Sequence, residues 1–408
     1  MMSKKSPQLR FEGFTDDWEQ RKLGSLTTVV RGASPRPIQD PKWFDKESDI
    51  GWLRIADVTE QNGRIYHLEQ HISKLGQEKT RVLTEPHLLL SIAATVGKPV
   101  VNYVKTGVHD GFLIFLNPTF EREFMFQWLE MFRPKWQKYG QPGSQVNLNS
   151  ELVRNQEIVL PNYKEQQKIG SFFKQLDETI ALHQRKLDLL KEQKKGYLQK
   201  MFPKNGAKVP ELRFAGFADD WEQRKLGEIS EKVTLKNKDN TFDETLTNSA
   251  EFGIISQNDF FDKEISNRSN LNGYYVVENN NFVYNPRISN FAPVGPIKRN
   301  KLGRTGVMSP LYYVFKTRNI DNDFLEKYFD TTYWHIFMKL NGDSGARADR
   351  FAIKDSVFKE MPIPFPKIEE QIKIGNFFKQ LDDTIALHQR KLDLLKEQKK
   401  GFLQKMFV

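Results

Sequence analysis

The sequence contains no cysteine among its 408 residues, so it forms no disulfide and offers no thiolate ligand to a metal ion. This absence fits a reducing cytoplasm, where we expect the protein to act. The longest apolar run, near Leu88 to Val96, is too short to span a bilayer. The opening residues, Met1 to Phe14, lack the apolar core of a signal peptide. We therefore expect no membrane among the partners.

Complete catalytic motifs are also missing. The seven histidines form no H-E-x-x-H cluster, and Val96 to Pro99 lacks the spacing and the hydroxyl residue of a P-loop. Tyr284 to Arg287 resembles the Asn-Pro-Pro-Tyr motif of amino-methyltransferases but lacks the second proline and the following aromatic residue. Glu192 to Lys194 matches part of a nuclease signature without its upstream Pro-Asp partner. The sequence predicts a chain with no catalytic residue, no metal site and no cofactor of its own.

What the chain does have is positive charge and ordinary apolar content. Lys and Arg number 62 against 52 Asp and Glu, which gives a formal net charge of +10. A balance of this size favours a polyanionic partner, nucleic acid first and an anionic membrane second. The length is sufficient for two or three domains with their own cores.

An internal repeat organises the whole sequence. Glu165 to Phe202 returns almost unchanged as Glu370 to Phe407, at an offset of 205 residues. A shorter repeat, Leu9 to Gly24, returns as Leu212 to Gly227. Because repeats dictate architecture, we interpret the chain as a tandem duplication with pseudo-twofold symmetry.

Each long repeat predicts one long helix. Both copies lack proline and are rich in Leu, Lys, Gln and Glu, and their apolar residues recur at alternating steps of four and three. This seam predicts two helices paired as an antiparallel-type coiled coil; the alternative is that each helix packs only on its adjacent globular part. The central seam residues are Phe173, Leu176, Ile180, Leu187 and Leu190, and in the second copy Phe378, Leu381, Ile385, Leu392 and Leu395.

Two features of the repeats have a structural and a chemical interpretation. His183 and His388 lie on the seam, where packing is favoured over metal binding because leucine stands at i+4. In the short repeat, Phe11, Phe14 and Trp18 could form an apolar cluster, with Asp16 or Asp17 capping the segment that carries Trp18. An acid/base or metal site at that Asp pair, or at Asp219 and Asp220, is disfavoured because adjacent acids usually point to different sides.

Two variable regions lie between the repeats, and we call residues 25–164 domain 1 and residues 228–369 domain 2. Both have short β-type runs bounded by Gly, Asn and Pro, then a helix, a polar glycine-containing loop and an apolar-proline exit. The expected helices are Glu121 to Phe132 and Asp323 to Lys339. We predict a mixed α/β fold shared by both domains. The complete predicted division is 1–24, 25–164, 165–202, 203–227, 228–369 and 370–408.

The pattern itself indicates a kind of function. Two scaffold elements are almost identical within the chain, whereas the two domains of one plan have diverged almost completely. The same mounting is therefore needed twice with different surfaces displayed, which fits a modular reader of two different targets.

This alternation resembles the specificity subunit of type I restriction-modification enzymes along the whole chain. The resemblance rests on EQ-x-KIG-x-FFKQLD-x-TI and KLDLLKEQKKG-x-LQKMF in the helices, on GWLRIADVTE and TVGKPV, and on the proline exits. It implies that each variable domain is a target-recognition domain reading half of a bipartite double-stranded DNA sequence. It also implies that Leu9 to Gly24 packs near the C-terminal helix, as Leu212 to Gly227 packs near the first helix, which closes the pseudo-symmetry.

The resemblance further implies partners and their chemistry. The paired helices would set the spacer between the half-sequences and dock two methyltransferase subunits, with restriction subunits joining the full complex. Adenine would be methylated at N6 by the methyltransferase subunits. S-adenosylmethionine, ATP and Mg²⁺ would be bound by these partners and none by this chain.

Candidate DNA contacts come from the polar loops, because Arg, Lys, Asn and Gln read base edges and grip phosphates. Taken singly, each could be a solvated surface residue. The candidates are Arg31, Arg36, Arg54, Lys98, Gln145 and Asn147 in domain 1, and Lys236, Asn237, Lys238, Arg287, Asn290, Arg347 and Arg350 in domain 2.

Two other classes of function stay open. One is a protein-binding scaffold whose duplicated domains hold two proteins, and the other is a stand-alone methyltransferase or nuclease. Leu182, Leu189 and Leu198 lie off the main seam, which suggests that the helices need partner subunits for stability.

Overall fold

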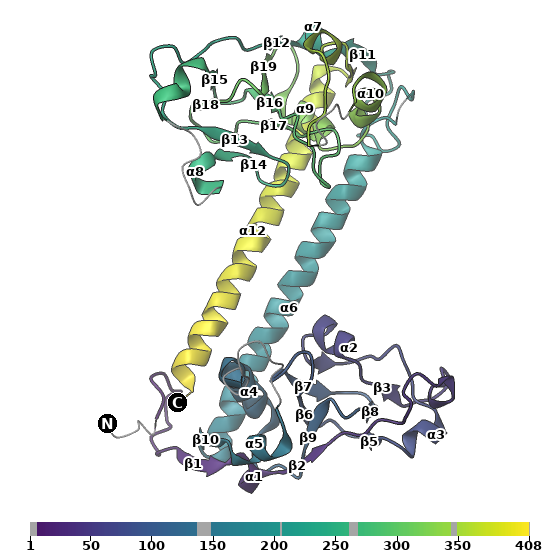
Figure 1. Ribbon diagram of the computed structural model, residues 1–408, viewed down its shortest axis with the longest axis vertical. Helices are drawn as coiled ribbons and strands as arrows, with labels where there is room; N and C mark the ends of the chain where they lie inside the picture. Colours follow the sequence, from purple (N-terminus) through teal and green to yellow (C-terminus); the bar gives the residue numbers. More distant parts are fainter. Residues whose placement is uncertain (1–5, 137–147, 205, 261–267, 344–348, 408) are drawn as a thin grey trace. The chain divides into compact units, whose positions relative to one another are not determined.

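The computed structural model describes residues 6–136, 148–204, 206–260, 268–343 and 349–407. The chain forms two compact units. Unit 1 comprises Met1–Arg185 together with Arg390–Val408, and unit 2 comprises Lys186–Gln389. Each unit contains one mixed α/β domain and parts of two long helices (Figure 1). The division follows the tandem duplication, with the two ends of the sequence sharing unit 1.

The long helices are α6 (Tyr163–Lys200) and α12 (Ile368–Met406). Both begin two residues before the predicted start. Within each unit the two helices run antiparallel, and equivalent residues make equivalent contacts. These are Phe172 with Phe402 at 5.1 Å between ring centroids and Asp177 with Lys399 at 2.5 Å in unit 1, and Tyr197 with Phe377 at 5.1 Å and Lys194 with Asp382 at 2.7 Å in unit 2.

The predicted seam follows the burial of the helices within each unit. Phe173, Leu187 and Leu190 are buried, whereas Leu176 and Ile180 are half-buried. Their counterparts show the same pattern, with Phe378, Leu392 and Leu395 buried and Leu381 and Ile385 half-buried. The seam histidines, His183 and His388, are half-buried too, as a packing role requires. Within each unit the helices contact each other as well as the adjacent domain, so the alternative in which each helix packs only on its adjacent globular part is wrong.

Domain 1 is built on a five-stranded sheet with a smaller three-stranded sheet beside it (Figure 1). The central strands are almost wholly apolar and buried, which is why they read as continuous hydrophobic runs rather than alternating ones. In order, the larger sheet contains β2 (Thr28–Arg31), β9 (Phe112–Leu116), β6 (Leu88–Ser91), β7 (Pro99–Asn102) and β4 (Arg64–Ile65), and the smaller contains β3 (Gly51–Trp52), β8 (Thr106–Val108) and β5 (Arg81–Leu83).

Domain 2 repeats this plan with shorter sheets. Its main sheet has the same order as the first four strands of domain 1, so β16 and β17 correspond to β6 and β7. The main sheet contains β12 (Ser230–Lys232), β19 (Tyr313–Thr317), β16 (Phe282–Tyr284) and β17 (Ile297–Arg299), and two-stranded pairs are formed by β13 (Leu246–Ser249) with β14 (Gly253–Ser256) and by β15 (Tyr275–Val277) with β18 (Gly306–Met308).

Helices complete the two domains. In domain 1 they are α1 (Leu23–Leu26), η1 (Pro41–Trp43), α2 (Ile55–Glu60), α3 (Lys74–Gln77), α4 (Arg122–Trp136) and α5 (Ser150–Asn155). In domain 2 they are α7 (Leu226–Ile229), α8 (Gln257–Phe260), η3 (Arg268–Gly273), α9 (Asn322–Phe329), α10 (Trp334–Asn341) and α11 (Asp355–Phe358). Within the described residues, no helix is long and apolar enough to cross a membrane.

The single helix expected from Asp323 to Lys339 is wrong, because α9 and α10 are separate. Asp330 ends α9, and its carboxylate is held by Lys298 at 2.8 Å and by Lys327 at 3.1 Å. The Thr331 hydroxyl donates to the Tyr328 carbonyl at 2.7 Å, which occupies a backbone acceptor at the helix end.

The interpretation of the short repeat also needs correction. Trp18 is followed by a strand, β1 (Glu19–Lys22), which pairs antiparallel with β10 (Glu157–Leu160), so Asp16 and Asp17 cap no helix. The second copy forms the equivalent pair of β11 (Glu222–Lys225) with β20 (Pro362–Phe365). Strand pairing here was hidden because the repeat is too short to show a period-2 pattern.

Each unit has a core in which the repeats and the domain meet. In unit 1, Phe407 from the end of α12 contacts Phe124 of α4 and Phe173 of α6 at 5.3 and 5.9 Å between ring centroids. In unit 2, Phe202 takes the equivalent place beside Phe324 and Phe378. The short repeats join the same cores, because the Leu9 amide donates to the Lys405 carbonyl and the Leu212 amide to the Lys200 carbonyl. The packing of the short repeats beside the helix ends is therefore as expected.

Candidate nucleic-acid interface

A buried ion pair anchors each short repeat to the start of a long helix. Arg10 donates through Nε and Nη2 to the two carboxylate oxygens of Glu165 at 2.7 and 2.8 Å. Arg213 makes the same two bonds to Glu370, also at 2.7 and 2.8 Å. Both glutamate side chains are almost fully buried. A fork-on-fork pair of this kind fixes orientation as well as position.

The next helix residues attach the domain itself. Gln166 accepts from the Glu121 amide at 2.9 Å, and Gln371 accepts from the Asp321 amide at 2.9 Å. One turn later, Gly170 and Gly375 let the start of the domain helix approach closely. A Cβ atom on Gly170 would lie 2.8 Å from the Phe124 backbone nitrogen. The repeated EQ-x-KI-G sequence therefore attaches the domain to the helix. We call these contacts, together with the arginine–glutamate pair, the mount of the domain.

An acidic side chain further along each helix binds the domain through different bases. Asp177 accepts from Arg64 at 3.2 Å and from Gln127 at 2.8 Å. Its counterpart Asp382 accepts from Lys327 at 2.7 Å. Burial alone would raise the pKa of Asp382, but Lys327 and Lys194 together outweigh it and hold that pKa below its usual value. The same carboxylate position thus attaches two unrelated domain surfaces.

In domain 1, Arg31 and Arg36 converge on one residue, Asp110. Arg31 Nε donates to the Asp110 carbonyl at 2.6 Å, and Arg36 Nη2 pairs with the Asp110 carboxylate at 2.9 Å. The Ser34 hydroxyl also donates to that carboxylate, and this bond and the two arginines lower the pKa of Asp110 against the effect of its burial. The Arg36 side chain is 80% exposed, so its guanidinium is available to a ligand.

A pocket of about 660 Å³ lies beside this cluster. Arg36 and Arg54 line it, together with Trp52 and His109, whose rings lie 5.8 Å apart. Arg54 is held in place by Asp57, with Nη2 to Oδ1 at 2.7 Å. The structure therefore brings three predicted residues, Arg31, Arg36 and Arg54, into one region of domain 1.

Lys98 has a different environment. Its side chain is 12% exposed, its ammonium group pairs with Glu130, and it donates to Asn62 Oδ1 at 2.8 Å. A lysine that is already neutralised by a carboxylate and largely covered is poorly placed to grip a phosphate.

The first polar loop of domain 2 contains one structural and two exposed candidates. Asn237 is buried, donates to the Phe242 carbonyl at 2.8 Å and accepts from the Phe242 amide at 3.1 Å, so it closes its own loop. Lys236 is exposed, with its ammonium 5.9 Å from the Tyr275 ring centre, and Lys238 is exposed as well. Asn237, which was predicted to contact DNA, therefore has a structural role: it shapes the loop that carries Lys236 and Lys238.

The second group in domain 2 lies on the connection between β16 and β17. Arg287 is paired by a β-bridge with Arg350, and Asn290 and Arg287 are exposed. Arg350, which is far from Arg287 and Asn290 in the sequence, is therefore a backbone neighbour of Arg287. Phe291, which follows Asn290, is 81% exposed and was not among the predicted residues. The candidates Gln145, Asn147 and Arg347 lie outside the described residues.

Tyr284 to Arg287, the partial methyltransferase motif, has a structural role. Asn285 is buried and its amide donates to the Asn248 carbonyl at 2.8 Å, while its Oδ1 accepts from the Arg287 amide at 3.0 Å. Its polar atoms are therefore engaged within the fold. Among the described residues, no group of three or more His, Asp or Glu could hold a metal ion.

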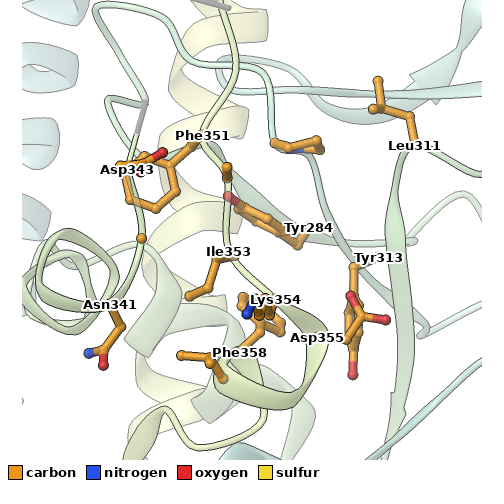
Figure 2. A pocket seen from close by; sticks show the side chains of 14 residues that line it. Tyr284, Leu311, Tyr313, Asn341, Asp343, Phe351, Ile353, Lys354, Asp355 and Phe358 are labelled. Atoms are coloured by element: carbon orange, nitrogen blue, oxygen red, sulfur yellow. The ribbon is translucent and has the colours of Figure 1, made fainter. Parts of the chain in front are cut away.

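A pocket of about 640 Å³ lies next to this connection (Figure 2). Aromatic rings of Tyr284, Tyr313, Phe351 and Phe358 line it, with Asp355 at its edge. The Tyr284 hydroxyl donates to the Val294 carbonyl at 3.0 Å, and burial raises the pKa of Tyr284. These contacts hold the base of the connection against the sheet, which supports the residues that it carries.

Some leucines of the long helices lie outside every core. Leu182, Leu189, Leu387 and Leu394 are 51–60% exposed and repeat at a spacing of seven residues on each helix. Leu198, the third off-seam leucine singled out from the sequence, is half-buried against the core of unit 2. The exposed set forms equivalent apolar stripes on α6 and α12.

Comparison with known proteins agrees with the sequence repeats. The family profile described as "Type I restriction modification DNA specificity domain" matches twice, over residues 15–192 and 218–397. The chain is 21% identical over 411 residues to the type I restriction enzyme MjaVIII specificity subunit of Methanocaldococcus jannaschii, covering 95% of this chain and 91% of that protein. It is 22% identical over 433 residues to a protein of the same organism assigned as the MjaX specificity subunit, at 95% and 92% coverage.

Solved structures show the same fold. The S subunit of a type I restriction-modification system from M. genitalium matches with a TM-score of 0.61 and 12% identity, over 99% of both chains. A chain from a study of assembly and conformational transition of the type I R-M system matches with a TM-score of 0.51 and 16% identity, over 96% of this chain and 97% of that one.

Proposed function

The chain belongs to the type I restriction-modification DNA specificity family, and from this premise we propose that domain 1 and domain 2 each read one half of a bipartite DNA target. Recognition of DNA targets by two domains is what this family does, and its specificity subunits are non-catalytic. The contacts proposed for this chain are basic and amide side chains of the loops: the exposed Arg31, Arg36, Lys236, Lys238, Arg287 and Asn290, and the half-buried Arg54 and Arg350.

One observation carries this proposal: identical mounts hold two domains with different loops. The Arg10–Glu165 and Arg213–Glu370 pairs have the same distances, whereas the loops share almost no sequence. Identical mounts give both domains the same orientation on their helices, and different loops present different side chains. A protein that reads an asymmetric two-part sequence requires this combination.

We assign the helices two tasks. Their exposed leucine stripes are apolar and duplicated, which suits two copies of one partner, the methyltransferase subunit. Restriction subunits join the same complex, and S-adenosylmethionine, ATP and Mg²⁺ belong to these partners. The helices also set the spacer, because an unbroken helix of this length reaches roughly 55 Å, enough to separate half-sites about one turn of B-DNA apart, ~34 Å.

The first test is the methylome of a host expressing this chain with its methyltransferase partner, compared with a host lacking only this chain. We expect a bipartite motif methylated at adenine N6 that disappears without the chain. An active partner that leaves no such motif would contradict the proposal and favour a protein-binding scaffold.

Affinity against salt separates these two functions directly. The logarithm of the DNA affinity falls linearly with the logarithm of the salt concentration, and each phosphate contact contributes about −0.9 to the slope. A DNA reader loses affinity steeply between low and moderate salt, whereas a scaffold has no DNA affinity to lose. Binding of S-adenosylmethionine by the isolated chain would instead revive the stand-alone methyltransferase.

Two engineered chains test the division of labour. Replacing domain 1 by that of another family member should change one half of the methylated motif only. Inserting one heptad in both α6 and α12 should lengthen the spacer and leave both half-sequences unchanged. A change in both halves after the exchange, or a constant spacer after the insertion, would contradict the corresponding task.

A further inference from the structure

The connection between β16 and β17, residues 285–296, carries a tight turn with Asn290 and Phe291 at its tip. The Ser289 and Ala292 amides donate to each other's carbonyls, both at 3.1 Å. The Ser289 hydroxyl also accepts from the Ala292 amide at 3.2 Å, and the Gly295 amide donates to the Ala292 carbonyl at 3.1 Å. Backbone bonds and the Ser289 hydroxyl hold this turn in shape, so the tip residues are presented by a preformed loop.

The Phe291 side chain is 81% exposed, more than any other large hydrophobic residue in the described part of the chain. Burying a phenylalanine side chain is worth about 1.5–3 kcal/mol, so an exposed ring contributes almost none of this to folding. A single exposed apolar residue is common on protein surfaces and needs a second observation before it suggests a function.

That second observation is the chemistry around the turn. Arg287 and Arg350 form a β-bridge at its base, because the Ile288 amide donates to the Asp349 carbonyl at 3.1 Å and the Phe351 amide to the Pro286 carbonyl at 2.8 Å. Two guanidinium groups and an amide side chain thus come from the segments that carry the ring. An apolar face among cationic groups is complementary to nucleic acid, which has anionic phosphates outside and apolar base faces inside.

Another exposed ring in the same domain provides a contrast. Phe252 lies at the turn between β13 and β14 and is 62% exposed. Its neighbour in the sequence is Glu251, whose carboxylate would repel phosphate. The turn of Phe291 thus has two arginines at its base, one of them 4.0 Å from the Asp349 carboxylate, whereas the charged neighbour of Phe252 is a glutamate.

Domain 1 has no equivalent ring. Its connection between β6 and β7, residues 92–98, is shorter and contains Ala93, Ala94 and Thr95 at its centre. The feature is thus a property of domain 2 and not of the shared mount.

We propose that Phe291 is an apolar wedge with which domain 2 enters the base stack of its half-target. The ring separates or caps one base step, while Arg287 and Arg350 hold the adjacent phosphates. Such wedges unstack and kink DNA at flexible steps, so Phe291 adds selectivity for deformable sequence at a position without hydrogen-bonded readout. The inference rests on the proposed function, because it requires that domain 2 lies on DNA.

The test uses the full chain in complex with its methyltransferase subunits on the mapped target. The probe is 2-aminopurine placed in turn at each position of the half-target that domain exchange assigns to domain 2. Its fluorescence rises where the base loses its stacking neighbour. Apart from the methylated adenines, which methyltransferases extrude from the base stack, we expect a rise at one step in this half and none in the half read by domain 1.

The variant F291A should abolish that rise and weaken target binding roughly 5- to 150-fold, the range for losing one base–aromatic stack. The slope of log affinity against log salt should stay constant, because no phosphate contact is lost. F291L, which keeps an apolar side chain, should retain part of the signal. The matched control F252A should leave fluorescence and affinity unchanged.

The possible failures are distinguishable. If F291A keeps the fluorescence signal and the affinity while the unaltered complex binds its target with a steep salt dependence, the wedge is wrong and the proposed function stands. If F291A instead loses its methyltransferase subunits on size-exclusion chromatography, the ring faces a protein and the wedge is also wrong. If the unaltered complex binds no bipartite target, the proposed function itself fails.

Discussion

The two units have the same attachments and different loops. The paired arginine and glutamate residues, the glutamine bonds to the domain helix and the close-approach glycines recur with distances that agree within 0.1 Å for the hydrogen bonds. The connections corresponding to β6–β7 and β16–β17 differ in length, composition and exposure. Sequence identity inside this chain therefore marks the places where a domain meets a helix, and divergence marks the loops that we propose meet a target.

The acidic helix residues refine this comparison. Asp177 and Asp382 occupy equivalent positions and each binds a lysine of the partner helix, but one takes an arginine from its domain and the other a lysine. A fixed carboxylate can thus accept whichever base a new domain supplies, which allows domains to diverge without redesigning the helix.

The largest effect that should distinguish the units comes from the buried glutamates. E165A leaves Arg10 without its partner, and E370A does the same to Arg213, so each should cost about 3 kcal/mol of unfolding free energy in its own unit. E370A should cost about 1 kcal/mol more, because Trp221 Nε1 also donates to Glu370 at 3.1 Å. Trp18 Nε1 has no such acceptor among the described residues.

Hydrogen exchange measured by mass spectrometry separates the two units and checks this order. The exposed glutamates Glu19 and Glu222 provide matched controls whose removal should change protection little. Equal losses of exchange protection in the two units would show that the Trp221–Glu370 hydrogen bond adds nothing to stability.

A smaller effect is expected from the close-approach glycines. A Cβ on Gly170 would lie 2.4 Å from Glu121 Oε2, and one on Gly375 would lie 2.7 Å from Asp321 Oδ1. G170A and G375A should each destabilise by about 1–3 kcal/mol, with G170A the more severe because its backbone contact is also shorter.

Replacing two other helix glycines by alanine should have the opposite effect on stability. A Cβ on Gly196 or Gly401 would meet nothing within 4 Å. G196A and G401A should therefore stabilise by about 0.5–1 kcal/mol through helix propensity. Urea unfolding of the four variants tests the contrast, and destabilisation by all four would refute the close-approach explanation.

A further difference between the units should appear with pH. Burial lowers the pKa of His335 to about 4, and Lys339 adds to this, whereas Asp110 opposes the lowering of the His109 pKa by burial in unit 1. Above about pH 6.5 the imidazole is neutral in both the folded and the unfolded chain, so protonation of His335 costs no stability there. Below this pH the unfolded chain binds a proton that folded His335 does not bind. The free energy of unfolding therefore falls as the pH approaches the pKa of the folded state.

Unit 2 should therefore lose about 1 to 2 kcal/mol between about pH 7 and pH 5 that H335Q does not lose. Exchange protection measured across this range gives the comparison. Parallel pH curves for H335Q and the unaltered chain would show that His335 is freely protonated in the folded unit.

The sequence predicted the long helices and the seam because a sustained heptad reports burial directly. It also predicted short strands in both domains, since apolar runs between turn residues are distinctive. Asn237 shows why the loop residues were harder: an amide that closes its own loop has the same sequence signature as one that faces a target. Phe291 was missed because exposure of a ring is a property of the folded turn, and an isolated phenylalanine in a sequence predicts a core.

The placement of Phe407 in the core of unit 1 has a consequence for synthesis on the ribosome. Unit 2 is formed by one continuous stretch of sequence. In unit 1, Phe124 and Phe173 contact Phe407, which is synthesised more than 200 positions later. At about 5–20 residues per second, the delay is roughly 10 to 40 seconds. During that interval the nascent chain exposes aromatic surface, so we expect unit 1 to depend on chaperones during translation more than unit 2, which is complete as soon as its own residues have emerged.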